Sequence, residues 1–498
     1  MQSEHPQVLH LSGVKKRFDW KRLFFILTGI GLFAAVYFCP PWPDAVDPAG
    51  THFILTREGK GAIAVFLLAA TWWIFEVVPI GVTSLTIGVL QVLFIIRDPG
   101  TAFRDFMDPS VLFIFGSIII GMVFTKTGLT RRMAYKMLSI VGERTAMIYL
   151  GCFVMTGVLT HFMAHTAVAA TMFPLLMAIH ALYADEGETT RFGKGLFIGM
   201  AYVAGAGSIV TLLGAARGAV ALGFYKDIMG VDISFFTLSW YMFPVGWLMI
   251  FLLWGFFLLF FKPEHSRIPG LKEKARGMYK DLGRWTHKEL LTVGIVLGTI
   301  LVIALKNFIP ALADLHKTGI ILCSTISFFL FNILTIDDLE EMPWNIILLF
   351  AGAMSMGFCL WETEAARWLA VHWLLLFQSS LPLIFILGMA FFVMMMTNFI
   401  MNVAAIAISL PVALVVAPYL GVSGEVILFS SLVVAGMPFL LLVGAAPNAI
   451  AYNSRQFSTG EFFLWGIPAS ILLMLAVWLA VTFIWPLMGM EIFVPVQG

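Results

Sequence analysis

Long apolar segments separated by short polar loops run through most of this 498-residue chain. A helix needs roughly 20 apolar residues to cross a hydrocarbon core about 30 Å thick. Segments that approach or exceed this length lie at 22–39, 61–80, 81–96, 111–126, 146–182, 194–224, 239–261, 291–308, 318–335, 345–361, 382–420, 424–453 and 463–486. The pattern predicts an all-α integral membrane protein in which most of these segments cross the bilayer once.

Four of the segments do not fit a single crossing. Segments 146–182 and 382–420 are each about twice as long as one crossing and carry polar residues near the middle. Segments 194–224 and 424–453 are also too long, and their centres are rich in Gly and Ala. Non-helical backbone is tolerated at membrane depth only where it lines a cavity inside the protein. We therefore predict two re-entrant hairpins and two broken helices.

Composition excludes several classes of protein. Apolar residues make up 60% of the chain and charged residues only 12%, whereas about a quarter of a soluble domain is charged. A water-soluble globule, a disordered chain and a nucleic-acid binder are therefore excluded. The 30 basic and 29 acidic residues indicate no polyanionic partner. The four cysteines lie far apart without a CxxC pair, so neither a metal site nor a disulfide framework is expected.

If each predicted hairpin enters and leaves on the same side of the membrane, the basic residues of the loops are divided unequally between the two sides. One side then receives most of them, in the N-terminal segment 1–21, the loops at 126–144 and 191–194, and the linker 262–290. Loops rich in Lys and Arg stay in the cytoplasm. We therefore predict a multi-pass protein of the cell membrane with a cytoplasmic N-terminus. The first apolar segment has no small-residue cleavage site and is expected to be retained.

The two halves of the chain repeat each other. THFMAHTAVAATMFP (Thr160–Pro174) matches TNFIMNVAAIAISLP (Thr397–Pro411) in its Thr, its Phe, an Ala pair and the final Pro. TLLGAARG (Thr211–Gly218) matches LLVGAAPN (Leu441–Asn448) in the same order along the chain. Because loop charge places the two hairpins on opposite sides, the halves form an inverted repeat. Paired hairpins and broken helices in an inverted repeat are typical of secondary transporters that bind substrate at the midplane.

This repeat defines the predicted organisation of the chain. The predicted parts are a cytoplasmic N-terminal segment (1–21), a first repeat (22–261) with hairpin 146–182 and broken helix 194–224, a cytoplasmic linker (262–290), and a second repeat (291–498) with hairpin 382–420 and broken helix 424–453.

At these residues the chain resembles the divalent anion:sodium symporter (DASS) family of the ion transporter superfamily, which carries dicarboxylates, citrate or sulfate. FEVVPIGVTSL (Phe75–Leu85) and FGSIIIGMVFTKTGL (Phe115–Leu129) also resemble segments of that family. The resemblance implies about 11 transmembrane helices plus the two hairpins, elevator-like movement of the hairpin-bearing domain, and a homodimer in membrane lipid. It also implies that substrate carboxylates and Na⁺ bind between the hairpin tips and the turns of the broken helices.

The motifs that carry these sites in the family are altered here. Family hairpin tips carry Ser-Asn-Thr, whereas this chain has Ala164-His165-Thr166 and Met401-Asn402-Val403. Family turns resemble Thr-Pro-Pro-Asn. The first turn here, Gly214–Gly218, lacks both prolines and the asparagine, and the second, Gly444–Asn448, keeps one proline and the asparagine. The chain therefore resembles a divergent member of this family.

Carried over position by position, the resemblance gives a set of expected site residues. The expected substrate-binding residues are His165, Thr166, Arg217, Asn402, Val403, Ala445, Pro447 and Asn448. The expected ion-coupling residues are Thr160, His165 and Gly214 at the first site and Thr397, Asn402 and Gly444 at the second. No cofactor is expected apart from Na⁺, which would be bound by Thr397, Asn402 and Gly444.

Two residues depart most from the family pattern. Arg217 stands three residues after Gly214, inside an apolar segment, where a charged side chain costs about 2.5–3.5 kcal/mol on insertion scales. Our hypothesis is that Arg217 supplies the positive charge that Na⁺ supplies in relatives. Alternatively, its planar guanidinium binds a substrate carboxylate directly. His165 has two alternative roles, as a neutral hydrogen-bond donor to substrate or as a proton carrier.

The sequence thus favours a secondary active transporter of small organic anions, resembling di- or tricarboxylates. We expect it to be Na⁺-independent at least at the first ion site and to work by exchange or by H⁺ coupling. The alternatives are a Na⁺-coupled dicarboxylate or sulfate symporter that uses the second site, an anion channel, and an arsenite or cation exporter of related fold. No HExxH, GxSxG or Walker A sequence is present, so no enzyme activity is expected.

Overall fold

The computed structural model describes residues 20–495, except 47–51, 76, 186, 306–308, 313, 378–380 and 400. Nearly all of the predicted N-terminal segment 1–21 lies outside these residues. The described chain is built from helices, with one pair of two-residue antiparallel strands, β1 (Ala45–Val46) and β2 (His52–Phe53). Eight described helices are long and apolar enough to cross a membrane. The predicted all-α membrane class is confirmed, while the count of about 11 spans stays a prediction.

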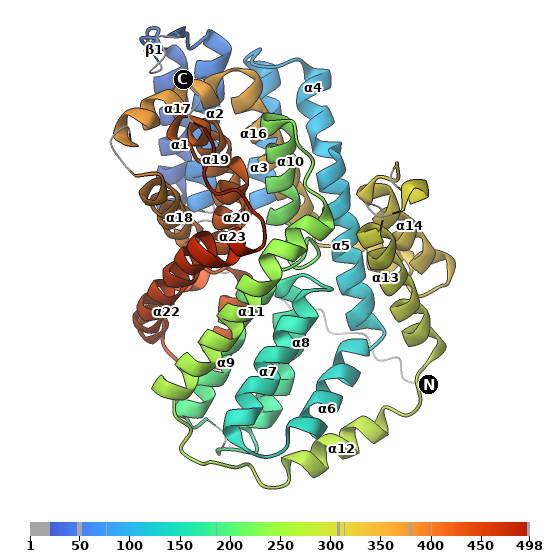
Figure 1. The fold of residues 1–498 in the computed structure, drawn as a ribbon. Helices are drawn as coiled ribbons and strands as arrows, with labels where there is room; N and C mark the ends of the chain where they lie inside the picture. The colour runs from blue at the N-terminus through green and yellow to red at the C-terminus, as the bar shows by residue number, and fades with distance from the viewer. Residues whose placement is uncertain are drawn as a thin grey trace, which may run out of the picture.

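The helices follow one another from α1 to α23, with short loops between most of them (Figure 1). The first half contains α1 (Trp20–Phe38), α2 (Arg57–Ile74), α3 (Ile80–Leu93), α4 (Pro99–Arg104), α5 (Pro109–Lys126), α6 (Leu129–Val141), α7 (Thr145–Thr160), α8 (His165–His180), α9 (Arg191–Gly207), α10 (Arg217–Met229), α11 (Phe235–Phe260) and α12 (Leu271–Asp281). The second half contains α13 (His287–Leu305), α14 (Lys317–Leu330), α15 (Ile336–Glu340), α16 (Trp344–Glu362), α17 (Ala365–Phe377), α18 (Pro382–Phe399), α19 (Asn402–Val416), α20 (Gly424–Ala435), α21 (Ala446–Tyr452), α22 (Thr459–Leu479) and α23 (Trp485–Leu487).

Local sequence explains where several helices begin. Asp108 caps α5 by accepting a hydrogen bond from the Ser110 backbone N–H at 2.7 Å, and Pro109 occupies the first helical position. Thr190 caps α9 in the same way. Ser458 and Glu461 form a reciprocal capping box at α22. Such caps satisfy backbone N–H groups that have no partner inside the helix.

Two pairs of packed helices lie within segments 146–182 and 382–420, and their re-entrant character stays a prediction. In the first, α7 packs against α8 through a turn at 161–164, and in the second, α18 packs against α19. Figure 1 shows α7 and α8 in the lower half of the molecule and α18 and α19 in the upper half, with the turns of both hairpins toward the middle. The second helix of each hairpin contains a proline, Pro174 in α8 and Pro411 in α19.

Two long segments break where Gly and Ala are frequent. The first breaks between α9 and α10, at 208–216, and the second between α20 and α21, at 436–445. The C-terminal ends of α9 and α20 meet, since a methyl group at Gly205 would lie 2.6 Å from the carbonyl oxygen of Gly436. Helix carbonyl ends from the two halves of the chain therefore face each other inside the protein.

The helix that follows each break packs against helices of the other half of the chain. Helix α10 packs against α19 and α20 of the other half, and α21 packs against α8 and α9. Each half therefore supplies a helix that completes the core of the other half.

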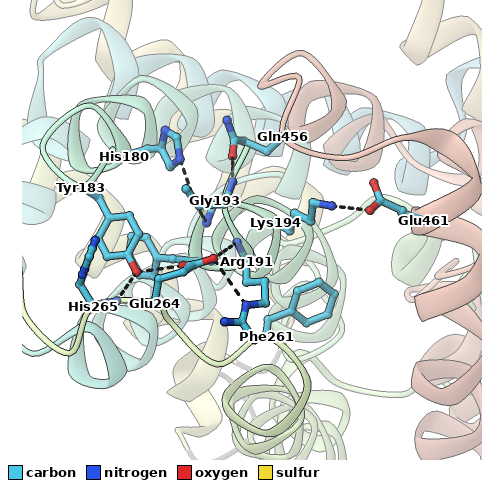
Figure 2. A network of polar contacts seen from close by, with 12 residues as sticks. His180, Tyr183, Arg191, Gly193, Lys194, Phe261, Glu264, His265, Gln456 and Glu461 are labelled. Atoms are coloured by element: carbon cyan, nitrogen blue, oxygen red, sulfur yellow. Dashed lines mark hydrogen bonds and ion pairs between the residues drawn. The ribbon is translucent and has the colours of Figure 1, made fainter. Parts of the chain in front are cut away.

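The basic loops that the sequence assigns to one side lie together at one end of the molecule. Figure 2 shows Glu264, which follows α11, between Tyr183 and Arg191. The Glu264 carboxylate accepts hydrogen bonds from the Tyr183 hydroxyl (2.9 Å) and the Arg191 backbone N–H (2.6 Å). At the same end Lys194 forms an ion pair with Glu461, and α12 packs on α6.

Candidate functional site

The turn of the first hairpin lies against the break between α9 and α10. The His165 backbone N–H donates to the carbonyl oxygen of Gly214 at 3.0 Å, and His165 Nδ1 lies 3.3 Å from the same oxygen. The Thr211 hydroxyl donates to the carbonyl oxygen of His161 at 2.8 Å. A methyl group at Gly214 would lie 2.5 Å from the Thr160 carbonyl oxygen. Only glycine therefore allows this close approach.

The turn of the second hairpin makes the corresponding approach to the break between α20 and α21. A methyl group at Gly444 would lie 2.9 Å from the Thr397 carbonyl oxygen. The Thr397 hydroxyl donates to the carbonyl oxygen of Ala435 at 3.1 Å. The Asn398 side-chain oxygen accepts hydrogen bonds from the backbone N–H groups of Leu440 (2.8 Å) and Leu441 (3.3 Å).

Arg217 joins the two turns. Its side chain is buried, at 2% exposure, and Nη2 donates to Ser208 Oγ at 2.9 Å. Its guanidinium packs so closely on Gly436 that no side chain fits at that position. Gly436 follows Ala435, whose carbonyl oxygen accepts a hydrogen bond from the Thr397 hydroxyl. Contacts through Arg217, Gly436 and Ala435 therefore connect the first hairpin turn to the second.

The surroundings of the Arg217 guanidinium are electrostatically negative. Ser208 follows the C-terminus of α9, and Gly436 follows the C-terminus of α20. Helix C-termini carry the negative end of the helix dipole and favour cations. Among the described residues, no carboxylate forms an ion pair with Arg217, and Nη1 has no hydrogen-bond partner. Arg217 also lines a cavity of about 10 Å³, which is roughly the space that one water needs.

The expected oxygen ligands differ between the two ion sites. At the first site the Thr160 hydroxyl, which is fully buried, donates to the Gly157 carbonyl at 2.6 Å. Position 164 has no side-chain oxygen, since it is alanine. At the second site the Thr397 hydroxyl and the carbonyl groups of Thr397 and Ala435 lie close together. Hard cations such as Na⁺ prefer ligands of this kind.

The remaining expected residues lie at the helix ends beside the turns. Asn402 and Val403 begin α19 and are buried, at 8% and 2% exposure. Ala445 has extended backbone just before α21, and Pro447 stands in the first turn of that helix. The Asn448 amide nitrogen donates to the carbonyl groups of Pro438 (2.8 Å) and Leu441 (3.1 Å). Asn448 therefore holds the second turn in this structure, and its predicted contact with substrate stays a prediction.

The two hairpins differ in exposure. His165 and Thr166 at the start of α8 are half-buried, and Ala170, one turn later, is exposed. From Ala167 onward α8 lines a cavity of 490 Å³ between α5, α6, α8 and α12. The corresponding start of α19 is covered by α10, α16 and α17. The first hairpin is thus reached from the α6–α12 end, and the second is enclosed.

Comparison with known proteins shows to which family this chain belongs. The family model described as the sodium:sulfate symporter transmembrane region matches residues 20–491. The chain belongs to this family. As a sodium:sulfate symporter family member, it is a membrane transporter and not an enzyme.

Curated relatives of this symporter family match almost the whole chain. The sodium-dependent dicarboxylate transporter SdcS of Staphylococcus saprophyticus is 24% identical over 465 residues, which cover 89% of each protein. SdcS of Staphylococcus aureus strain USA300 is 25% identical over 466 residues, which cover 88% of each protein. The chain is similar to these transporters along their length, and the predicted family resemblance is confirmed.

Two solved structures share the fold of this family member. The first is MtrF of Neisseria gonorrhoeae, described as illuminating a class of antimetabolite efflux pumps, with a TM-score of 0.55, 10% identity, and coverage of 92% of this chain and 93% of MtrF. The second is the YdaH transporter of Alcanivorax borkumensis, with a TM-score of 0.53, 13% identity, and coverage of 94% of this chain and 98% of YdaH. At these identities the likeness concerns the fold alone.

Sequence reasoning missed two groups of buried polar residues in this symporter. One is Asn398, whose signal is its position, since it corresponds to His161 in the repeat and interrupts an apolar segment. The other surrounds Arg97, which is bound by Asp105 (2.6 Å) and Glu362 (2.7 Å). Arg97 and Glu362 belong to different halves of the chain, and no local pattern in the sequence relates them.

Proposed function

We propose that this protein is a secondary active transporter of small organic anions, resembling dicarboxylates, in which Arg217 takes the place of the cation at the first ion site. The relatives support the substrate class, since they are named as sodium-dependent dicarboxylate transporters. The single observation that carries the proposal is the position of the Arg217 guanidinium at the meeting point of two helix C-termini.

Electrostatics favours a resident cation at this position. In transporters with broken helices, the C-terminal ends of the half-helices and unwound carbonyl groups hold the coupling cation. Arg217 occupies that kind of environment and carries its positive charge permanently. A Na⁺ ion close by would be repelled, because Coulomb repulsion is strong where water is scarce. Transport therefore needs no Na⁺ at the first site.

The same contacts favour this role over direct binding of substrate. Arg217 is 2% exposed, and Nη2 is already engaged by Ser208. A carboxylate bound in a bidentate manner needs two guanidinium N–H groups that point into the substrate cavity. Arg217 instead stabilises the backbone around the anion site, and its charge attracts the anion.

The substrate anion is held, in this proposal, between the two hairpin turns. Helices α8 and α19 both begin there, so the positive ends of their dipoles face the anion. Thr166, which is half-buried at the start of α8, donates a hydrogen bond to a carboxylate. Asn402, Val403, Ala445 and Pro447 form the opposite wall. Because Nδ1 is directed at the Gly214 carbonyl, the single proton of a neutral ring is on Nδ1 and Nε2 is an acceptor. His165 therefore donates to the carboxylate only after a change of tautomer or uptake of a second proton.

The second site is proposed to bind a single Na⁺. The Thr397 and Ala435 carbonyl groups, the Thr397 hydroxyl and the Asn402 amide supply oxygen, and no resident cation stands at Pro447, which matches Arg217 in the repeat. The specific observation that favours residual Na⁺ coupling is this retained set of oxygens. In that case one Na⁺ accompanies each cycle at most.

We also propose the arrangement in the membrane. The two halves act as an inverted repeat, the end that contains α6 and α12 faces the cytoplasm, and the hairpin-bearing domain moves as an elevator within a homodimer. Support comes from the basic loops gathered at that end and from the 490 Å³ cavity that opens there. In this arrangement the structure is the inward-facing state.

Reconstituted protein tests the function directly. Purified protein in liposomes is assayed for uptake of radiolabelled succinate, with and without unlabelled succinate trapped inside. Accelerated uptake against trapped succinate identifies a carrier, whereas an ohmic current without counterflow contradicts the proposal and indicates a channel.

A sodium titration tests the ion assignment in the same liposomes. We expect a Hill coefficient of about 1 or no sodium dependence at all in the wild type. If Arg217→Asn transports at the wild-type rate with the same sodium dependence, Arg217 does not replace an ion and the proposal is wrong.

A further inference from the structure

The cavity along α8 contains one cation that the proposed mechanism does not use. Arg131, in the first turns of α6, lines this cavity and is exposed. Within the described part of the chain no carboxylate forms an ion pair with it. Its guanidinium turns back over the loop before α6, since a methyl group at Gly128 would lie 3.6 Å from Nη2.

The other basic side chains of α6 and of the end of α5 are engaged, unlike Arg131. Arg132 is buried and binds Glu289, with Nε 2.7 Å from Oε1. Lys126 forms an ion pair with Asp338. Lys136 stacks over the ring of Tyr279, with Nζ 5.4 Å from its centroid. A charge without a counterion at the wall of a cavity attracts anions from solution.

The walls of the cavity are chemically divided. Four of its polar residues, Thr125, Thr130, Arg131 and Tyr135, come from α6 and from the end of α5 beside it. The fifth, Thr171 of α8, donates its hydroxyl proton to the Ala167 carbonyl at 2.9 Å. The facing wall is largely apolar and consists of Ala167, Ala170, Pro174, Leu175 and Ala178 of α8 together with Met278 of α12. A ligand that fits both walls carries a carboxylate at one end and hydrocarbon in its body.

We infer that this cavity is a second binding site for organic anions, at which Arg131 binds one carboxylate while the apolar wall of α8 contacts the carbon skeleton. The inference rests on the proposed function, because it takes the cavity as the route to the hairpin turns. The site prefers anions with an apolar body over equally charged anions without one, since burying each additional methyl group strengthens binding about fourfold.

Thiol modification at Ala170 tests the charge in the cavity without any transport assay. Ala170 is exposed on α8 within the cavity. The probe is Ala170→Cys in a chain whose accessible Cys39 and Cys323 are replaced by serine. Its thiolate displaces sulfinate from a methanethiosulfonate, with formation of a mixed disulfide. We compare the rates for an anionic sulfonatoethyl reagent and a cationic trimethylammonioethyl reagent.

One positive charge nearby raises the anionic rate and lowers the cationic rate, each by about threefold at low salt. We expect this preference to disappear in Arg131→Gln. It persists in the control Arg276→Gln, which removes an exposed cation of α12 that does not line the cavity. An anionic preference that is unchanged in Arg131→Gln overturns the inference.

Protection by two matched dicarboxylates tests the ligand class. Glutarate and 3,3-dimethylglutarate carry the same charge, and the second has two additional methyl groups. We expect 3,3-dimethylglutarate to slow modification of the Ala170→Cys protein at concentrations at least about fivefold lower than glutarate, and Arg131→Gln to remove most of this protection. Equal protection by both anions, or protection that survives Arg131→Gln unchanged, overturns the inference.

These readouts separate the inference from the function on which it rests. If the wild type transports neither anion but the Ala170→Cys protein shows Arg131-dependent modification and protection, the proposed function fails and the binding site stands. If the wild type transports both anions and modification is insensitive to Arg131, the site fails and the proposed function stands.

Discussion

The two hairpin turns approach their broken helices through the same backbone geometry, but the side chain that holds each turn comes from a different partner. In the first half the Thr211 hydroxyl on the broken helix donates to a carbonyl of the hairpin turn, that of His161. In the second half Asn398 of the hairpin accepts from backbone N–H groups of the broken helix, at Leu440 and Leu441. In both halves the broken helix donates and the hairpin accepts, but the side chain in the bond belongs to the broken helix in the first half and to the hairpin in the second. The glycine contacts are equivalent.

The halves also differ in charge and access. Arg217 places a permanent cation in the first turn, where the second turn has Pro447. The first hairpin faces an open cavity, whereas the second is covered by α10, α16 and α17. A repeated framework can therefore keep its backbone contacts while one copy acquires a buried charge that the other lacks.

Removal of the resident cation should have the largest effect. In Arg217→Ala we expect succinate uptake in liposomes to fall at least about 100-fold, because the loss of a buried charge beside the anion site weakens transition-state binding by several kcal/mol. Arg217→Lys, which keeps the charge, should retain part of the uptake. Equal loss in both variants would assign the effect to packing and remove the electrostatic difference between the halves.

Asn398 and His161 offer a direct comparison of matching positions. Asn398→Leu leaves the half-buried backbone N–H groups of Leu440 and Leu441 without their partner, at up to about 1–3 kcal/mol each, so we expect a lower melting temperature and reduced uptake. His161→Leu should leave the melting temperature unchanged or raise it, because neither buried ring nitrogen has a hydrogen-bond partner among the described residues. Thermal unfolding of purified protein in detergent measures both. Similar losses in the two variants would show that the halves depend on these positions alike.

The hydrogen bond of Thr211 should contribute less to the stability of the fold than the hydrogen bonds of Asn398. Thr211→Val keeps the shape of the side chain and removes the single hydrogen bond to the His161 carbonyl, which costs about 1 kcal/mol. We expect a small decrease in melting temperature with uptake largely retained. Thr211→Ser, which keeps the hydroxyl, is the matched control. A loss in Thr211→Val as large as that in Asn398→Leu would contradict the ranking of the two turns.

The smallest effect should come from the loop that anchors the first hairpin outside the membrane. Burial acts to raise the pKa of Glu264, but hydrogen bonds from the Arg191 backbone and the Tyr183 hydroxyl outweigh it and hold the pKa below its usual value. A lowered folded-state pKa means that Glu264 stabilises the fold above its unfolded pKa and loses this contribution as pH falls through the folded value. Because the group is largely exposed, its contribution at pH 7 is less than about 1 kcal/mol.

Glu264→Gln should therefore lower the melting temperature slightly at pH 7, and this difference should disappear as pH falls through the lowered folded-state pKa of Glu264. Thermal unfolding across the acidic and neutral pH range measures this difference. A destabilisation that is the same at every pH would show that the carboxylate charge does not contribute. Glu273→Gln, on the exposed surface of α12, is the control for removal of an acidic residue at this end.

The sequence predicted the class of fold and the places where its helices break, because both depend on strong local signals. Apolar length marks the spans, and the centres of the overlong segments mark the turns. His165 lies against Gly214 in the structure, and the site roles that the family resemblance gives to His165, Gly214 and Arg217 stay predictions. The breaks follow the Gly- and Ala-rich stretches to within a few residues.

Other features depend on contacts between distant residues and leave no local signal. The ion pair between Arg97 and Glu362 joins residues of different halves. The amide of Asn448 matched a family motif that contacts substrate, yet here it donates to two backbone carbonyl groups. A motif gives the position of such a side chain, whereas the direction of its hydrogen bonds depends on the turn that it joins.

The exchange of α10 and α21 between the halves has a consequence for biogenesis. Helix α10 emerges from the ribosome long before its partners α19 and α20. Until those residues are made, its contact surface has only lipid, translocon or solvent to cover it, and pairing over such a separation is slow. The hairpin-bearing core can therefore assemble only after synthesis is nearly complete, and quality-control factors would meet a chain whose first half has entered the membrane without yet being folded.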